Sequence, residues 1–129
     1  MIVGTVNSHR EAVVRLVVHG EEVIAKEIEV VIDTGFSGWL SLPPSLIAQL
    51  ELAYRRRGLA TLADGSEILY SIYEGTVEWQ ETIRRIPIDE AETDPLIGMA
   101  LLQGYELNIE VTKGGNVSIK QLPQKDPRA

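Results

Sequence analysis

Apolar and polar residues alternate along much of the chain with a period of two, which is typical of strands with one buried face. The clearest case is residues 22–32, where one face is formed by Ile24, Ile28, Val30 and Ile32. Glu27 and Glu29 alternate with them on the opposite face. Valine and isoleucine together number 25, and these β-branched residues fit a pleated surface. Pattern and residue type therefore predict a chain that is mostly strand.

Turn residues divide the rest of the chain into further strands. Asp64-Gly65 lies between two strand-like runs, a strong signal for a hairpin, so residues 59–63 and 66–73 are expected to pair. A second hairpin is expected to turn at Gln80-Glu81. The other predicted strands cover residues 12–18, 39–42, 76–79, 82–88, 96–97, 105–112 and 117–120.

Helical spacing is confined to two short segments. Leu46, Ile47 and Leu50 follow a pair of prolines, which predicts a helix over residues 45–52. Residues 99–103 are expected to form one or two helical turns that end at Gly104. Arg55-Arg56-Arg57-Gly58 is predicted to be a loop.

These elements predict an all-β fold, a small, closed and mostly antiparallel β-barrel with one or two short helices. Closure is expected because it removes exposed strand edges. Residues 1–120 are predicted to form a single domain, and residues 121–129, which are polar and contain two prolines, are predicted to be a C-terminal tail.

Charge and residue content exclude several classes of function. The chain has 19 acidic and 12 basic residues, a net charge of −7, which disfavours nucleic acid and anionic membranes as partners. It has no cysteine, so thiol catalysis and thiolate metal sites are excluded, and it has only two histidines. No metal or other cofactor is predicted. No apolar run approaches the roughly 18–20 residues of a membrane span, and no secretion signal is visible, so a cytoplasmic location is expected.

The segment with candidate chemistry is Asp33-Thr34-Gly35, at the end of the predicted strand 22–32. Alone it is weak evidence, because Asp and Gly also favour an ordinary turn. Its context is more specific: an apolar pair running into glycine, Leu96-Ile97-Gly98, follows much later, and a hairpin tipped by Asp64-Gly65 lies between them. Phosphate-loop and H-E-x-x-H motifs are absent from the sequence.

This order of motifs resembles that of the single-domain, retropepsin-like aspartic peptidases, over about residues 22–111. In that family a strand delivers Asp-Thr-Gly to the active site, a hairpin flap covers the cleft, and a later hydrophobic-hydrophobic-Gly segment braces the catalytic loop. Ser37 and Met99 stand where retroviral members have an acidic residue and an arginine that pair. The loop therefore looks closer to the pepsin-type and bacterial versions.

The resemblance implies a role for each matching segment. Asp33 would be the catalytic carboxylate, Thr34 would join the active-site loops of two subunits, and Gly35 would let the substrate backbone approach. The flap that contacts substrate would be formed by Ala63, Asp64, Gly65 and Ser66. The lining of the side-chain pockets would come from Leu96, Ile97 and Gly98.

Hydrolysis of this kind needs two carboxylates that share one proton. The chain has one Asp-Thr-Gly, and its other aspartates lack that context. The sequence therefore predicts a homodimer with Asp33 from each subunit at the two-fold axis, acting as an aspartic endopeptidase on peptides or unfolded proteins. Retroviral relatives intertwine their chain ends, and residues 1–6 and 117–120 are candidates for that role.

Two alternatives stay open at this point. The chain could be a catalytically weak or inactive retropepsin-like module, with a binding or regulatory role, that holds an extended peptide by strand addition. It could also be a small barrel subunit of a larger complex, in which Asp33 serves only the structure of a turn.

Overall fold

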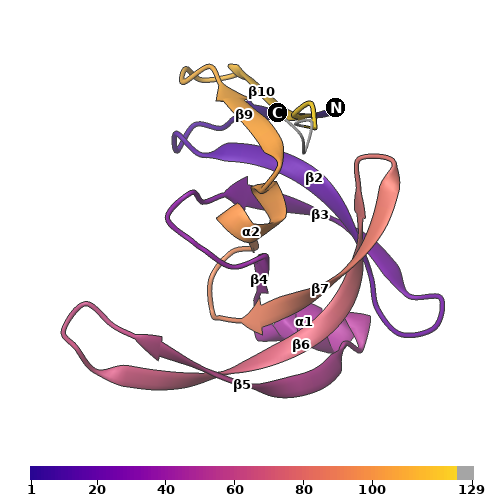
Figure 1. Cartoon of the computed structure of the whole chain (residues 1–129), viewed down its shortest axis with the longest axis vertical. Helices are drawn as coiled ribbons and strands as arrows, with labels where there is room; N and C mark the ends of the chain where they lie inside the picture. The colour runs from indigo at the N-terminus through magenta and orange to yellow at the C-terminus, as the bar shows by residue number, and fades with distance from the viewer. Residues whose placement is uncertain (125–129) are drawn as a thin grey trace.

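The computed structural model describes residues 1–124, and their strands form one continuous sheet in the order β5-β6-β7-β4-β8-β3-β2-β1-β10-β9 (Figure 1). The strands are β1 (Ile2–Val6), β2 (Ala12–His19), β3 (Ala25–Ile32), β4 (Leu40–Leu42), β5 (Ala53–Thr61), β6 (Glu67–Trp79), β7 (Thr82–Glu90), β8 (Leu96–Ile97), β9 (Tyr105–Ile109) and β10 (Asn116–Gln121). Two short helices accompany them in this part of the chain, α1 (Pro44–Leu50) and α2 (Met99–Leu102).

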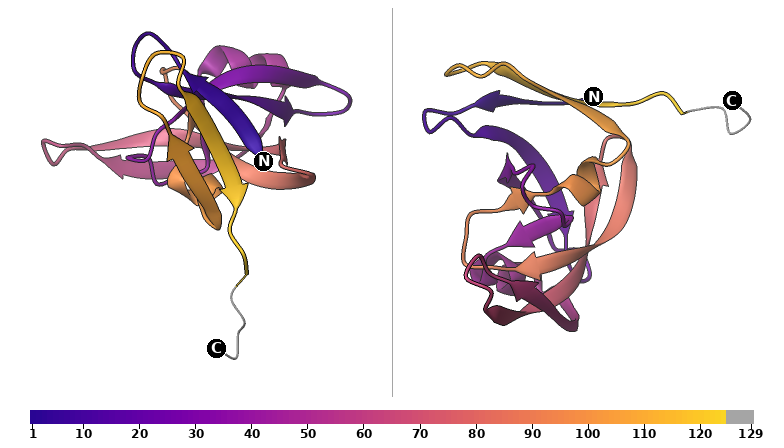
Figure 2. Two further views of the ribbon diagram at one scale, coloured as in Figure 1. Left: turned by 90° about the horizontal axis from the view of Figure 1, so that it is seen from above. Right: turned by 60° about the vertical axis from the view of Figure 1, so that its left-hand side comes forward.

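A pairing between β2 and β6 closes the sheet. Val18 lies opposite Val77 and His19 opposite Thr76, so the six strands from β6 to β2 in the sheet order form a barrel. The strand β5 extends the sheet on one side of this closure, and β1, β10 and β9 extend it on the other (Figure 2). The predicted all-β barrel with short helices is therefore confirmed.

The barrel interior is filled by the apolar face of each strand. Ile28, Val30 and Ile32 of β3 are buried while Glu27 and Glu29 are exposed, as the alternation predicts. At one end of the core lies Trp79, which is fully buried and packs edge-on against Tyr105 with ring centres 5.5 Å apart. The helix α1 adds further apolar side chains, Ile47 and Leu50, to the same core.

Both predicted hairpins are present. The chain between β5 and β6 turns over residues 62–66, where Gly65 has a φ of +86°. The carboxylate of Asp64 accepts hydrogen bonds from the backbone N–H and the hydroxyl of Ser66, which together lower the pKa of Asp64. The second hairpin turns at Gln80 and Glu81, between β6 and β7.

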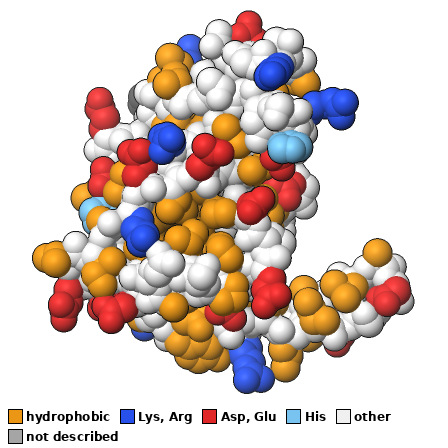
Figure 3. Space-filling model, turned by 180° about the vertical axis from the view of Figure 1, so that it is seen from behind, with side chains coloured by type: hydrophobic (Ala, Val, Ile, Leu, Met, Phe, Trp, Pro, Cys, Tyr) orange, Lys and Arg blue, Asp and Glu red, His pale blue; other side chains and the backbone are white. Residues whose placement is uncertain are grey.

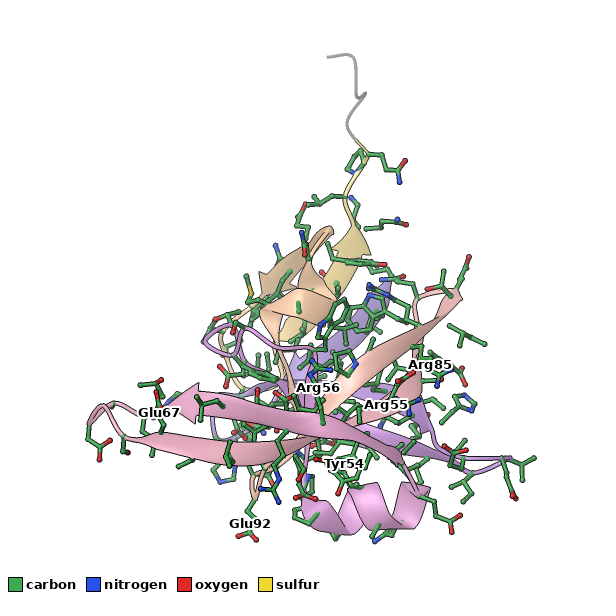
Figure 4. The ribbon with its side chains drawn as sticks, turned by 60° about the horizontal axis from the view of Figure 1, so that its bottom comes forward. Tyr54, Arg55, Arg56, Glu67, Arg85 and Glu92 are labelled. Atoms are coloured by element: carbon green, nitrogen blue, oxygen red, sulfur yellow. The ribbon has the colours of Figure 1, made fainter. Side chains whose placement is uncertain are left out.

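The predicted loop at residues 55–58 is wrong, because these residues belong to β5. This strand is an edge of the sheet, where neither face has to be buried, so three exposed arginines are compatible with a strand. Arg55 and, from β7, Arg85 both pair with the carboxylate of Glu74 on β6. Figure 4 shows the two arginines on the strands that flank β6. These contacts tie the charged strand to its neighbours.

The two ends of the chain and the end of helix α1 also differ from the predicted elements. Residues 2–6 form β1, which the alternation did not reveal, and Ile2 lies opposite Ile119 of β10 in the same chain. The helix α1 ends at Leu50 because Glu51 adopts a left-handed conformation with a φ of 52°. The strand β10 runs to Gln121, one residue into the predicted tail, and residues 125–129 of that tail lie outside the described part. Neither helix of residues 1–124 is long and apolar enough to cross a membrane.

Candidate active site

Asp33 follows the last residue of β3 and is held there by the neighbouring strand. The short strand β8 runs parallel to β3, with Ile32 opposite Ile97. The backbone N–H of Asp33 donates to the carbonyl oxygen of Ile97 at 2.9 Å. The N–H of Gly35 donates to Oδ1 of Asp33, also at 2.9 Å, which orients the half-buried carboxylate. The motif therefore forms a tight turn whose carboxylate has a defined direction.

Three backbone hydrogen bonds fasten the loop that follows Asp33 to the segment that begins at Gly98. The N–H groups of Gly98, Met99 and Ala100 donate to the carbonyl oxygens of Trp39, Phe36 and Gly38, at 3.1, 2.8 and 3.0 Å respectively.

Gly98 makes this close approach possible. A Cβ atom at this position would lie 2.2 Å from the oxygen of Gly38 and 2.6 Å from the Phe36 ring. The structure thus brings together the two segments that the sequence singled out, the Asp-Thr-Gly loop and Leu96-Ile97-Gly98.

A cleft of about 990 Å³ opens beside Asp33. Its walls are the loop of residues 33–38, the arms of the β5–β6 hairpin and the end of β7 with the residues that follow. The hairpin projects from the barrel and carries exposed apolar side chains (Figures 1 and 3). Of these, Leu59, Ile68 and Leu69 line the cleft. The site is therefore a wide, partly apolar groove with a carboxylate at one wall.

The predicted contact residues lie at different depths. Leu96 lines the cleft, whereas Ile97 has no exposed surface and Gly98 is buried beneath the loop. The predicted flap residues 63–66 form the exposed tip of the hairpin and are not part of the cleft wall, which the arms provide.

Thr34 opens onto a second hollow rather than onto the cleft. This groove, of about 600 Å³, lies on the other side of the Asp33 loop, and its lining includes Met99, Leu102, Tyr105 and Leu107. Met99 is about half exposed there. The active-site loop thus separates a cleft beside Asp33 from an apolar groove beside Thr34.

Asp89, at the end of β7, is a cleft residue that the sequence reasoning missed. Burial raises the pKa of its carboxyl group, and the guanidinium of Arg56 opposes that rise. Burial and the negative charge of Asp89 also raise the pKa of the Tyr70 phenol, on β6. The alternation of Ile86 and Ile88 with Asp89 shows that Asp89 leaves the core face, but the chain alone does not reveal what it faces.

Two further carboxylates, Glu90 and Glu92, complete the acidic part of the cleft wall. No group of three or more His, Asp or Glu side chains within residues 1–124 is arranged to bind a metal ion.

No protein-family model and no curated protein matches the sequence. The fold, by contrast, is that of the retropepsin-like aspartic proteases. A solved structure that shares it is a retropepsin-like aspartic protease from Rickettsia conorii, with a TM-score of 0.59 over 94% of this chain and 90% of the other. The two sequences are 16% identical, so the similarity concerns the fold.

Proposed function

We propose that the protein is a dimeric aspartic endopeptidase in which two copies of Asp33 form the catalytic pair. The observation that carries this proposal is the position of Asp33, half-buried in a braced loop at the wall of a large cleft. The retropepsin-like fold supports it, because the Asp-Thr-Gly motif on which the resemblance to that family rests occurs here in a chain with the same fold.

The chemistry requires two carboxylates at close range. Two such groups about 3 Å apart cannot both ionise easily, so the pair shares one proton. The ionised Asp33 takes a proton from water as the water attacks the peptide carbonyl, and the protonated Asp33 donates to the carbonyl oxygen. The pair titrates as a unit, so its two pKa values belong to neither residue alone.

A second copy of the chain would supply the missing carboxylate. Thr34 and the apolar groove beside it support this arrangement, because they lie next to Asp33 but on the far side of the loop from the cleft. In the dimer, Thr34 joins the two loops and Gly35 leaves room for the substrate backbone. The peptide or unfolded segment lies in the cleft under the hairpin, whose tip at residues 63–66 serves as the flap.

Cleavage of a peptide mixture from a denatured proteome, between about pH 3.5 and 7, tests this proposal. We expect the unchanged protein and an Asp94→Asn control, altered at an exposed aspartate outside the cleft wall, to give the same products by mass spectrometry. Asp33→Asn should give none while keeping its fold. Cleavage by Asp33→Asn would overturn the proposal, and binding of peptides without cleavage by either form would support a non-catalytic module instead.

Sedimentation of the unchanged protein tests the dimer separately. We expect association that increases with concentration and with an added transition-state analogue. A monomer under both conditions would contradict the proposed mechanism, because one chain provides a single Asp33.

A further inference from the structure

Asp89 belongs to a row of side chains that crosses four strands of the sheet. On β7 it lies opposite Ser41 of β4 on one side and Ile72 of β6 on the other, and Ile72 lies opposite Arg56 of β5. Residues directly opposite one another in neighbouring strands share a face. Ser41 and Asp89 both line the cleft, so this end of the row forms part of its wall.

The carboxylate of Asp89 lies close to Gly38 in the wall of the cleft. A Cβ atom added at Gly38 would lie 2.5 Å from the Phe36 ring and 3.4 Å from Oδ2 of Asp89, so the backbone of Gly38 and the ring of Phe36 form the surroundings of this carboxylate on that side. Tyr70 is close enough to Asp89 for the two groups to interact electrostatically, and its ring packs over Gly58. The carboxylate of Asp89, the phenol of Tyr70 and the buried Ser41 all line the partly apolar cleft, and the part of the wall that they form is called the recess below.

The charge of Asp89 lacks a close cationic partner. None of the ion pairs within residues 1–124 involves Asp89. The positive charge of Arg56 is near enough to attract the carboxylate of Asp89, but the two groups are not in contact as an ion pair. The cleft wall contains the carboxylates of Asp33, Asp89, Glu90 and Glu92 and, among its described residues, no Lys, Arg or His. Removing a carboxylate from water without pairing it is unfavourable. The recess would be stabilised by a cation that the substrate brings.

We propose that Asp89 is a specificity-determining residue that binds the ammonium or guanidinium group of a lysine or arginine side chain of the peptide substrate. This inference rests on the proposed peptidase function and adds the class of substrate. The apolar residues of the wall, including Phe36, Leu59, Leu69 and Leu96, accommodate neighbouring apolar side chains. Preferred substrates are therefore extended peptides with one basic residue among apolar ones, and an acidic residue at the same position is excluded by repulsion.

The experiment compares peptides that differ at one position, with lysine, the uncharged norleucine or glutamate there, in a sequence that the protein cleaves. We expect the unchanged protein and Asp94→Asn to prefer lysine over norleucine by about tenfold or more in kcat/KM, as for a hydrogen bond between charged groups. Asp89→Asn should reduce this ratio to about one, and Asp89→Lys should favour the glutamate peptide. A lysine preference that Asp89→Asn leaves unchanged would overturn the proposal.

Arg56 provides a second and independent test, because its positive charge acts on the carboxylate of Asp89. If Asp89 is open to substrate, Arg56→Gln keeps or increases the preference for lysine. If the unchanged protein shows no preference and Arg56→Gln creates one, Arg56 occupies the carboxylate and the proposal is wrong.

Binding measurements separate this proposal from the peptidase function. Fluorescence anisotropy measures how tightly the same labelled peptides bind to two variants that should not cleave them. These variants are Asp33→Asn and the double variant Asp33→Asn with Asp89→Asn. Tighter binding of the lysine peptide that depends on Asp89, in a protein that cleaves nothing, would support the recess and reject the peptidase. If the unchanged protein cleaves peptides but the lysine and norleucine peptides bind equally well, the peptidase function is supported and the recess is rejected.

Discussion

At the scale of single residues, Gly98 is required for space rather than for backbone freedom. Its φ of −105° is accessible to any residue, but a Cβ atom would meet the oxygen of Gly38 at 2.2 Å and that of Phe36 at 2.7 Å. Both atoms belong to the backbone of the Asp33 loop, so neither can rotate away. The loop and the segment after β8 would have to separate.

We therefore expect Gly98→Ala to destabilise the protein by about 1–3 kcal/mol, the usual range for an overpacked interior. Denaturant unfolding measures this change. Gly35→Ala in the same loop is the matched control, because its Cβ would meet only Oδ1 of Asp33, at 3.2 Å, and should reduce stability less. Equal stability of Gly98→Ala and the unchanged protein would show that the loop is not held as described.

Asp89 gives a prediction on pH. Because burial raises its pKa above 3.8, the folded chain binds a proton at Asp89 more readily than the unfolded chain. At a pH above the pKa of Asp89 in both the folded and the unfolded chain, the ionised carboxylate therefore lowers the free energy of unfolding. This destabilisation disappears as the pH falls below the pKa of Asp89 in the unfolded chain. Arg56 on β5 and Tyr70 on β6 are charged or titratable groups that interact with it.

Asp89→Asn should thus raise the Tm at pH 7, and the difference should vanish near about pH 3. Thermal melts of both forms at the two pH values check this, with Asp94→Asn as the exposed control. A lower Tm for Asp89→Asn at pH 7 would mean that Asp89 is stabilised by Arg56 in the folded chain.

The sequence was enough to find Asp33 but not Asp89. Asp33, Thr34 and Gly35 form a local motif, and the turn that they make depends mainly on their own backbone and side chains. The recess at Asp89 depends on the registers of β4, β5, β6 and β7, which join residues 41, 56, 72 and 89. No local pattern encodes such a row, so its chemistry appears only once the sheet is known.

At the scale of elements, the outer part of the β5–β6 hairpin has little packing support. Beyond the barrel it has strand pairs such as Leu59 opposite Leu69, whose side chains are 57% and 62% exposed. The ladder of backbone hydrogen bonds is present, but little packing protects it. A two-stranded hairpin without such packing is only marginally stable.

We expect the backbone amides of residues 59–69 to exchange with solvent much faster than those of β2 and β3, which lie in the barrel. Hydrogen exchange read by mass spectrometry tests this, and a bound transition-state analogue should slow the exchange of the hairpin selectively. Protection of the free hairpin equal to that of β2 would contradict this account.

Alternation predicted β3, which has one wet and one buried face, and turn residues predicted both hairpins. Alternation did not predict that residues 55–58 belong to a strand, because an edge strand such as β5 can expose both faces. It also did not reveal β1, whose five residues gain their partners from β2 and from the distant β10. In each case the deciding contact lies elsewhere in the chain.

At the scale of the whole molecule, the net charge of −7 opposes the association of two copies. Added salt screens this repulsion, since the screening length falls from about 30 Å at 0.01 M to about 8 Å at 0.15 M. We expect sedimentation equilibrium to show tighter dimers at the higher ionic strength. Weaker association in salt would indicate that ion pairs rather than apolar contacts hold the dimer together.

The pairing of β1 with β10 in one chain has a consequence for how the activity would be controlled. In each copy β1 pairs with β10 of the same chain, while on the proposed mechanism the carboxylate pair exists only between copies. When copies are scarce, the number of working pairs therefore grows with the square of the amount of protein. On this mechanism the concentration of the protein sets its activity. Dilute protein would be mostly inactive monomer, and concentrating the chains at one place in the cell would activate them.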